Sequence, residues 1–337
     1  MRNQIIIQKL QVPFNSLVCK YDYYIEGQST IILQNIQVKD TLFISDNFIL
    51  IECVNKYISL FIYNIKNQEL KFILDKVKSF SLLPDKRFVV ACNDNCVKLY
   101  DMEICQKEIN LPIYEVLSFE DKVILRGQGL FIWDLKDNII PLEDNYQSNS
   151  ANLFEKDKLI TVYKHQMKIW NLHTLVCEAV LIGHKYIITN LVVSNQSIVS
   201  TSLDGQIRIW RDRVCCKVIQ DFDNLQNIII IGDKIIIREF NNVILKILSV
   251  NDGSFLGTLK VHLKYINIIQ SLPNNQLIIG HYSSYEIWDL DSLQCIKTFG
   301  DNSRYFSLII SFIYPLYFEG QNILLSNDGG EGLVMWR

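Results

Sequence analysis

The chain has 337 residues, which is longer than most single domains, and 49% of them are hydrophobic. Its 33 basic and 36 acidic residues are interspersed and leave a net charge of −3, which argues against a broad nucleic-acid or membrane-binding face. No apolar run is long enough to span a bilayer, and Ile5–Ile7 is too short for a signal-peptide core, so we expect no membrane insertion.

Short β-branched runs such as Ile228–Ile231 and Ile235–Ile237 predict buried strands rather than helices. Turn signals divide the chain into units of four such strands, which indicates an all-β fold. In chain order, we predict units at residues 40–77, 78–111, 114–141, 151–181, 187–219, 228–259, 266–298 and 306–336. The last unit has three strands, at residues 306–311, 322–326 and 333–336.

One strand in each unit ends in a large side chain, and these marker residues recur at steps near 40 residues. They are Tyr63, Tyr100, Trp133, Trp170, Trp210, Leu248, Trp288 and Trp336. A repeat of this length with four strands per unit is typical of a propeller. Because one unit cannot bury its own apolar face, we expect the units to stack in a ring.

Gly183-His184, Asp204 and Trp210 provide the most specific match, because Asp204 precedes Trp210 by the six residues typical of a WD repeat. The chain resembles the WD-repeat β-propellers over roughly residues 29–337. The resemblance implies a buried hydrogen-bonded network made by His184, Ser200 or Ser202, Asp204 and Trp210. Other units depart from this pattern, and Trp-Asp pairs occur only at Trp133-Asp134 and Trp288-Asp289.

The last predicted unit lacks a fourth strand, and an unpaired edge is a liability that proteins cover. We expect Ser29–Ile36 to pair with Leu333–Trp336 and close the ring as a single domain spanning residues 29–337. The count is then eight four-stranded blades. The alternative is seven blades, with the Tyr63 unit as an N-terminal appendage. Residues 1–28 form an N-terminal extension in which Asn3–Leu10 could be a strand, and residues 312–320 are predicted to be an inserted aromatic loop.

The nine cysteines include no C-x-x-C pair, and we expect reduced, buried thiols. Cys92-x-x-x-Cys96 supplies half a metal site, but no histidine or second cysteine pair has matching spacing, so no metal site is expected. None of the five histidines has the spacing of a helical metal site, and no glycine-rich phosphate loop or nucleophile elbow is present. We therefore expect no cofactor, no small-molecule substrate and no catalysis, with a channel-mouth enzyme as one alternative.

The resemblance implies binding of peptides or domains on the face formed by the turns between strands b and c and between blades. Tyrosine and arginine are common interface anchors. The predicted contact residues on this face are Lys164, Lys185, Tyr186, Tyr265, Tyr282, Tyr285, Arg304 and Tyr305.

These features predict a non-catalytic scaffold that binds other proteins and supports assembly of a multiprotein complex. Trp210-Arg211-Asp212-Arg213 approximates the Trp-Asp-x-Arg box of ubiquitin-ligase substrate receptors, which keeps that role as a second alternative, although arginine replaces the aspartate. The expected location is the cytoplasm, with the nucleus as an alternative.

Overall fold

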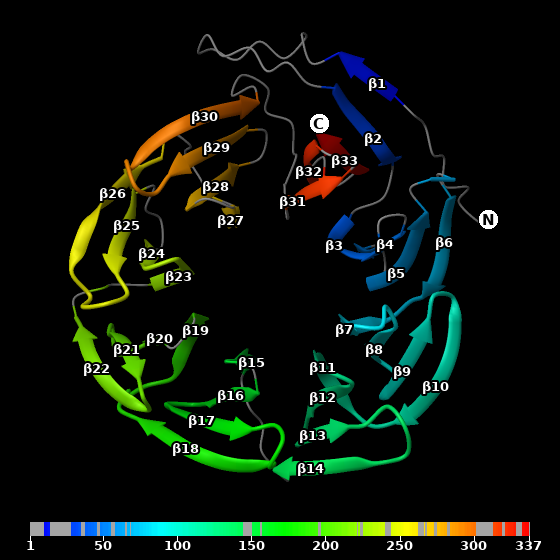
Figure 1. Cartoon of the computed structure of the whole chain (residues 1–337), viewed down its shortest axis with the longest axis horizontal. Coiled ribbons are helices and arrows are strands. Elements are labelled where there is room, and N and C mark those ends of the chain that lie inside the picture. The colour runs from blue at the N-terminus through cyan, green and yellow to red at the C-terminus, as the bar shows by residue number, and fades with distance from the viewer. Residues whose placement is uncertain are drawn as a thin grey trace.

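A ring of small β-sheets forms the protein in the computed structural model (Figure 1). The structure describes residues 10–13, 28–34, 38–45, 48–54, 58–64, 66–67, 69–143, 150–155, 157–194, 197–220, 222, 225–239, 244–261, 266, 268–272, 275–281, 284–300, 313–318, 321–327 and 332–336. For the described residues that lie between 10 and 43 and between 313 and 336, it describes the backbone alone. Within these ranges the strands form eight antiparallel sheets.

The strands alternate with short turns, as the periodicity predicts. The first four sheets in the chain are β3 (Val38–Ser45), β4 (Phe48–Val54), β5 (Ile58–Asn64) and β6 (Glu69–Leu74); β7 (Val77–Leu82), β8 (Phe88–Cys92), β9 (Cys96–Asp101) and β10 (Ile104–Asn110); β11 (Ile113–Phe119), β12 (Lys122–Gly127), β13 (Leu130–Trp133) and β14 (Ile139–Glu143); and β15 (Ser150–Phe154), β16 (Lys158–Tyr163), β17 (Gln166–Asn171) and β18 (Val176–Ile182).

The next three sheets have the same strand order. They are β19 (Ile188–Ser194), β20 (Ser197–Ser202), β21 (Ile207–Arg211) and β22 (Val214–Ile219); β23 (Leu225–Ile231), β24 (Lys234–Glu239), β25 (Ile244–Ser249) and β26 (Phe255–Lys260); and β27 (Ile268–Leu272), β28 (Gln276–His281), β29 (Ser284–Asp289) and β30 (Gln294–Gly300). In each sheet the first strand, strand a, faces the centre of the ring and the fourth, strand d, lies on its rim (Figure 1).

The hydrophobic cores lie between successive sheets rather than inside any one of them. Among the described side chains there are six such cores, and each contains the marker residue of the later sheet: Tyr100, Trp133, Trp170, Trp210, Leu248 or Trp288. The marker side chain therefore packs against the preceding sheet, which is why it recurs once per unit.

Each central strand is buried on both faces. In β21, Trp210 belongs to the core shared with the preceding sheet, whereas its neighbour Ile209 belongs to the core shared with the following one. In the paired strand β20, Ile198 and Val199 divide in the same way. Burial on both faces accounts for the continuous apolar runs of the sequence and for its high hydrophobic content.

The remaining sheet joins the two ends of the chain. Its order is β1 (Leu10–Pro13), β2 (Gln28–Gln34), β33 (Gly332–Trp336), β32 (Gln321–Asn327) and β31 (Ile313–Phe318). The register between β2 and β33 runs from Ser29 opposite Trp336 to Gln34 opposite Gly332. Main-chain hydrogen bonds between distant segments thus cover the edge of β33, and Figure 1 shows β2 beside β33 where the ring meets.

One prediction near the C-terminal end of the chain needs correction. Residues 312–320 are not an inserted loop, because 313–318 form β31, which pairs with β32 throughout its length. The prediction rested on the step from Trp288 to Trp336, which is longer than the other steps between markers. β31 ends its sheet, and the missing N–H of Pro315 is tolerated in an edge strand. The strand predicted at 306–311 lies outside the described residues. In the N-terminal extension the structure describes β1 at Leu10–Pro13, and residues 3–9 of the strand predicted at 3–10 lie outside the described residues.

The described part of the chain consists of strands and turns, and it contains no helix long and apolar enough to cross a membrane.

Truncation tests the role of β2. Deleting residues 1–37 removes β1 and β2 and leaves β33 as an open edge, so we expect loss of cooperative thermal unfolding. Deleting residues 1–20 removes β1 but keeps β2, and we expect this variant to unfold cooperatively near the wild-type temperature. Wild-type melting of the longer deletion, followed by circular dichroism, would show that β2 does not hold the ring closed.

Candidate functional site

The residue that follows the marker aromatic stabilises the turn between strands c and d. Asp134, Asn171 and Asp289 each follow a tryptophan, and each accepts hydrogen bonds from main-chain N–H groups two to four residues ahead. A short polar side chain that bonds to the backbone of its own turn in this way is an Asx turn. The Trp-Asp and Trp-Asn pairs of the sequence thus have a local structural role.

The indole N–H of each described tryptophan finds a different acceptor. Trp210 donates to Ser200 Oγ at 2.9 Å, and Trp170 donates to Thr161 Oγ1 at 3.0 Å. Ser200 and Thr161 occupy the same position in strand b, the second strand of each sheet. Each lies two residues after the residue that is paired across the strands with the tryptophan. In the other two sheets this position is apolar, so Trp288 donates to Glu286 Oε2 at 2.8 Å and Trp133 to the Lys136 carbonyl at 3.1 Å.

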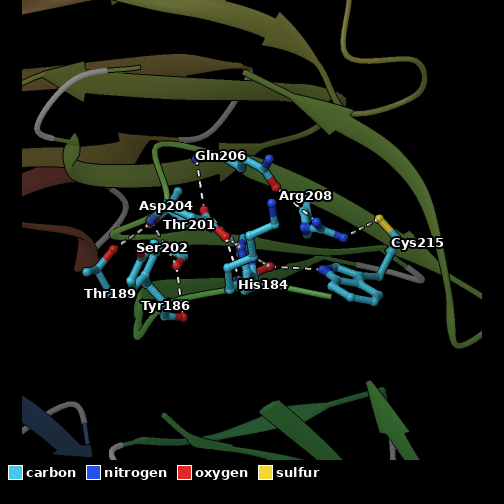
Figure 2. Close-up of polar contacts among 12 residues, drawn as sticks. His184, Tyr186, Thr189, Thr201, Ser202, Asp204, Gln206, Arg208 and Cys215 are labelled. Atoms are coloured by element: carbon cyan, nitrogen blue, oxygen red, sulfur yellow. Dashed lines mark hydrogen bonds and ion pairs between the residues drawn. The ribbon is translucent and has the colours of Figure 1, made fainter. Parts of the chain in front are cut away.

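In the sheet of β19–β22, two further side chains extend the contact between Trp210 and Ser200 to the surface. His184 Nε2 lies 2.8 Å from Ser200 Oγ, and His184 Nδ1 lies 3.0 Å from Asp204 Oδ2. Four side chains therefore form one hydrogen-bonded network from the buried indole of Trp210 to the turn at Asp204, part of which is visible in Figure 2. Of the two serines that the sequence offered, Ser200 is the one that bridges histidine and tryptophan.

The donors and acceptors of this network fix its protonation state. An indole can only donate and a carboxylate can only accept, so Ser200 Oγ accepts from Trp210 and His184 Nδ1 donates to Asp204. The Ser200 hydroxyl then donates to His184 Nε2, which must carry a lone pair. The network is thus satisfied at every atom only when His184 is neutral.

The electrostatic surroundings agree with that state. Burial lowers the pKa of His184 below its ordinary value, although the Asp204 carboxylate opposes the shift. Burial acts to raise the pKa of Asp204, but hydrogen bonds from the Lys185 N–H, from His184 and from the Gln206 N–H leave it below its ordinary value. A neutral imidazole beside an ionised carboxylate makes a charge-assisted hydrogen bond that stays intact at neutral pH.

Two glycines accommodate the network. A Cβ at Gly183 would lie 2.4 Å from the Arg208 guanidinium and 3.1 Å from the Trp210 ring, so the residue before His184 has little room for a side chain. Gly205 follows Asp204 in the tight turn with φ of +73°, a conformation that glycine adopts without strain.

Ser202 joins the two loops above this network. Its hydroxyl donates to the Tyr186 carbonyl at 3.0 Å and accepts from the Asp204 N–H at 3.2 Å. The Leu203 N–H donates to the Ile187 carbonyl, also at 3.0 Å. Ser202 and the main chain of Leu203 therefore join the loop between β18 and β19 to the turn between β20 and β21, in addition to the contact between His184 and Asp204.

These two loops carry an exposed apolar surface. Tyr186, Ile187 and Leu203 have 62%, 48% and 67% of their surface exposed. Lys185 lies in the same loop and is exposed. Lys164, which is also exposed, lies in the adjacent b–c turn, and its carbonyl accepts a hydrogen bond from the Ile188 N–H at 2.8 Å. We call these five residues the Tyr186 patch. Because Asp204 is 4% exposed and held by His184, its charge is directed into the fold rather than toward this surface.

The structure thus places three of the eight predicted contact residues together: Lys164, Lys185 and Tyr186. Tyr265, Tyr282, Arg304 and Tyr305 lie outside the described residues, and Tyr285 lies in β29, where only its backbone is described. Ile187 and Leu203 were missed because the prediction considered only tyrosine and charged side chains. Leu203 could have been found as a large apolar residue directly before a tight turn, where no strand covers it.

Between this sheet and the preceding one lies a pocket of about 470 Å³, which is lined by Phe154, Lys158, Trp210, Arg211 and Arg213, among others. Arg211 donates to Ser197 Oγ at 3.0 Å and to the main-chain carbonyls of Asn251 and Val250 in the next sheet. Lys158 and Arg213 both pair with Glu178. The cations near the Trp210-Arg211-Asp212-Arg213 segment are therefore paired within the chain.

Among the described residues, one group of histidine, cysteine or acidic side chains is compact enough to hold a metal ion. It consists of Cys92, Asp94 and Cys96, at the turn between β8 and β9. The eight described cysteines are free thiols.

Comparison with known proteins agrees with this geometry. The model of the WD domain, G-beta repeat, matches residues 69–101 and 175–211; the second segment contains all four residues of the hydrogen-bonded network. A crystal structure of the computationally designed Ika8 protein is similar in fold, with a TM-score of 0.66 and 16% identity, covering 90% of this chain and 96% of that one. The comparison with curated proteins found no match.

A double-mutant cycle tests the network. We expect Ser200→Ala and Asp204→Ala each to cost about 1–3 kcal/mol, because each leaves a buried polar partner unsatisfied. The double variant should lose clearly less than the sum, since the first substitution already breaks the network. As a matched control, Thr161→Ala should add to Asp204→Ala, because Thr161 binds Trp170 in another sheet. Urea melts that give additive losses for Ser200 and Asp204 would contradict the network.

The neutral state of His184 predicts a pH dependence. Its pKa is lowered in the folded state, so the unfolded chain binds the proton more tightly, and folding stability falls as the pH drops below about 6.5. We expect His184→Gln to lower stability at pH 7.5 and to flatten the decline between pH 7.5 and 5.5, by at most about 1.4 kcal/mol per pH unit. Parallel declines in denaturant melts of the two proteins would mean that His184 does not titrate differently on folding.

Proposed function

Because the chain is a WD-repeat β-propeller protein, we propose that it is a non-catalytic scaffold that binds other proteins through the Tyr186 patch. WD40 repeats generally mediate protein–protein interaction, and the family is generally non-enzymatic. The observation that carries the proposal is the surface above the buried network, where Tyr186, Ile187 and Leu203 are exposed on loops joined by hydrogen bonds.

The rigidity of these loops supports binding. Association costs less conformational entropy when the binding surface is already ordered. Both loops are tied to one another by Ser202 and by the main chain, and to the core by His184 and Asp204. Exposed apolar side chains on a rigid scaffold are the usual anchors of an interface.

The charges around the patch indicate the chemistry of the partner. Lys164 and Lys185 are exposed at its border, while Asp204 faces His184. The complementary segment is one that presents an apolar side chain to Tyr186 and Leu203 and carries acidic residues beside it. Through such contacts, the protein would hold components of a multiprotein complex.

Affinity capture with matched variants tests this function. We expect Tyr186→Ala combined with Leu203→Ala to keep a wild-type melting temperature, because exposed substitutions usually change stability by less than about 0.5 kcal/mol. The same variant should lose at least one partner that the wild type captures from its native cell, or weaken it more than about 30-fold, as expected when anchor residues are removed.

The control is Val214→Ala combined with Phe255→Ala, which removes two apolar side chains of similar exposure, 62% and 63%, from outer strands. It should capture the wild-type set of proteins. If the control loses the same partners as the patch variant, or if the patch variant loses none, the Tyr186 patch is not the binding surface. Lys164→Glu with Lys185→Glu should also weaken a captured partner, and the loss should shrink at high salt.

A further inference from the structure

The turn between β8 and β9 carries two cysteines and an aspartate. β8 ends at Cys92, β9 begins at Cys96, and Asp94 lies in the middle of the three-residue turn. One ligand atom from each side chain, the two Sγ atoms and a carboxylate oxygen, lies within 4.8 Å of the others. Cys96 Sγ is 3.1 Å from Asp94 Oδ1.

This turn corresponds to the one that holds Asp204. Asp94 precedes Tyr100 by six residues, as Asp204 precedes Trp210, so Cys92 takes the place of Ser202 and Cys96 that of Gln206. The register position that Ser200 occupies in the other sheet is filled here by Val90. Asp94 therefore has no serine and tryptophan beneath it, and cysteines stand where the other turn has Ser202 and Gln206.

The donor set and its surroundings fit a metal ion. Two sulfurs and one carboxylate oxygen are ligands that zinc accepts, with metal distances of about 2.3 Å to sulfur and about 2.0–2.2 Å to oxygen. In a tetrahedral site such ligand atoms lie about 3.5–3.8 Å apart, which small side-chain rotations can reach from the present spacing. Cys92 and Cys96 are 2% and 3% exposed, whereas Asp94 is exposed and gives access from solvent.

We propose that Cys92, Asp94 and Cys96 bind one zinc ion, with the fourth tetrahedral position open to water or to a ligand from a partner. This proposal departs from the expectation that the chain binds no metal. In forming that expectation we looked for a histidine or a second cysteine pair and did not consider the aspartate between the two cysteines. Binding replaces the proton of each thiol by the metal, and both protons go to the buffer.

The ionisation of the free groups is consistent with such an exchange. Burial raises the pKa of both thiols, so without metal they are protonated. The hydrogen bond from Cys96 lowers the pKa of Asp94, although desolvation acts in the opposite direction.

Titration of the full chain with cobalt and zinc tests the proposal. The protein is kept reduced with a phosphine, and its free thiols are counted by alkylation before each titration. We expect one equivalent of Co²⁺ to give the absorption of a tetrahedral ion with thiolate charge-transfer bands, and one equivalent of Zn²⁺ to abolish it. Cys96→Ser should weaken zinc binding at least about 100-fold, and Asp94→Asn about 10-fold or more.

Cys105→Ser is the matched control, since Cys105 is an exposed thiol on β10 of the same sheet, and it should leave the titration unchanged. Asp94→Asn changes an exposed turn residue, so it tests the site even if Cys96→Ser does not fold. The proposal is overturned if the reduced wild-type protein gives no cobalt spectrum at stoichiometric metal, or if the spectrum survives in Asp94→Asn and Cys96→Ser alike. A chain that only forms a Cys92–Cys96 disulfide on oxidation, and binds no metal when reduced, also overturns it.

Discussion

The fold depends on one constraint: a four-stranded sheet of this size cannot bury either of its faces alone. Each described core is therefore shared by two successive sheets, and the marker aromatic of the later sheet packs against the earlier one. A row of sheets that share cores in this way leaves apolar faces at both ends unless it closes. The pairing of β2 with β33 supplies that closure with main-chain hydrogen bonds.

The same constraint places polar groups in the core. An aromatic residue large enough to fill the space between sheets is often tryptophan, and a buried indole needs an acceptor. Thr161, Glu286 and the Lys136 carbonyl each meet this need locally. Ser200 also passes the contact on to His184 and, through it, to Asp204. That network reaches the surface at the loops that carry Tyr186 and Leu203, so core packing and the candidate binding surface are linked.

Much of the fold could be predicted from the sequence, because strand alternation and the spacing of the marker residues are local signals. Ser29–Ile36 was predicted as a strand from the missing partner of residues 333–336, and β2 occupies 28–34. Residues 313–318 were predicted as part of an inserted loop because the step from Trp288 to Trp336 is longer than the other steps, but they form the edge strand β31. Edge position is a property of the whole sheet, which marker spacing does not reveal. The acceptor roles of Thr161 and Glu286 also depend on cross-strand register, which no local pattern reveals.

The buried network was expected from the resemblance of Gly183-His184, Asp204 and Trp210 to the WD-repeat pattern. The exposure of Ile187 and Leu203 was not, because an apolar residue beside a strand is usually buried, and only the direction of the turn leaves these two in solvent. Cys92, Asp94 and Cys96 are close in the sequence, but closeness alone does not bring side chains together. Their side chains converge because a tight hairpin places both cysteines on one side.

Native-state hydrogen exchange of the amides of Lys185, Leu203 and Gln206 tests whether the buried network holds the loops of the Tyr186 patch rigid. These N–H groups donate to Asp204, to the Ile187 carbonyl and to Asp204, respectively. The account predicts protection close to that of the central strand β20, with loss of protection in Ser200→Ala. Exchange of these amides at the rate of an unstructured peptide in the wild-type protein would contradict it.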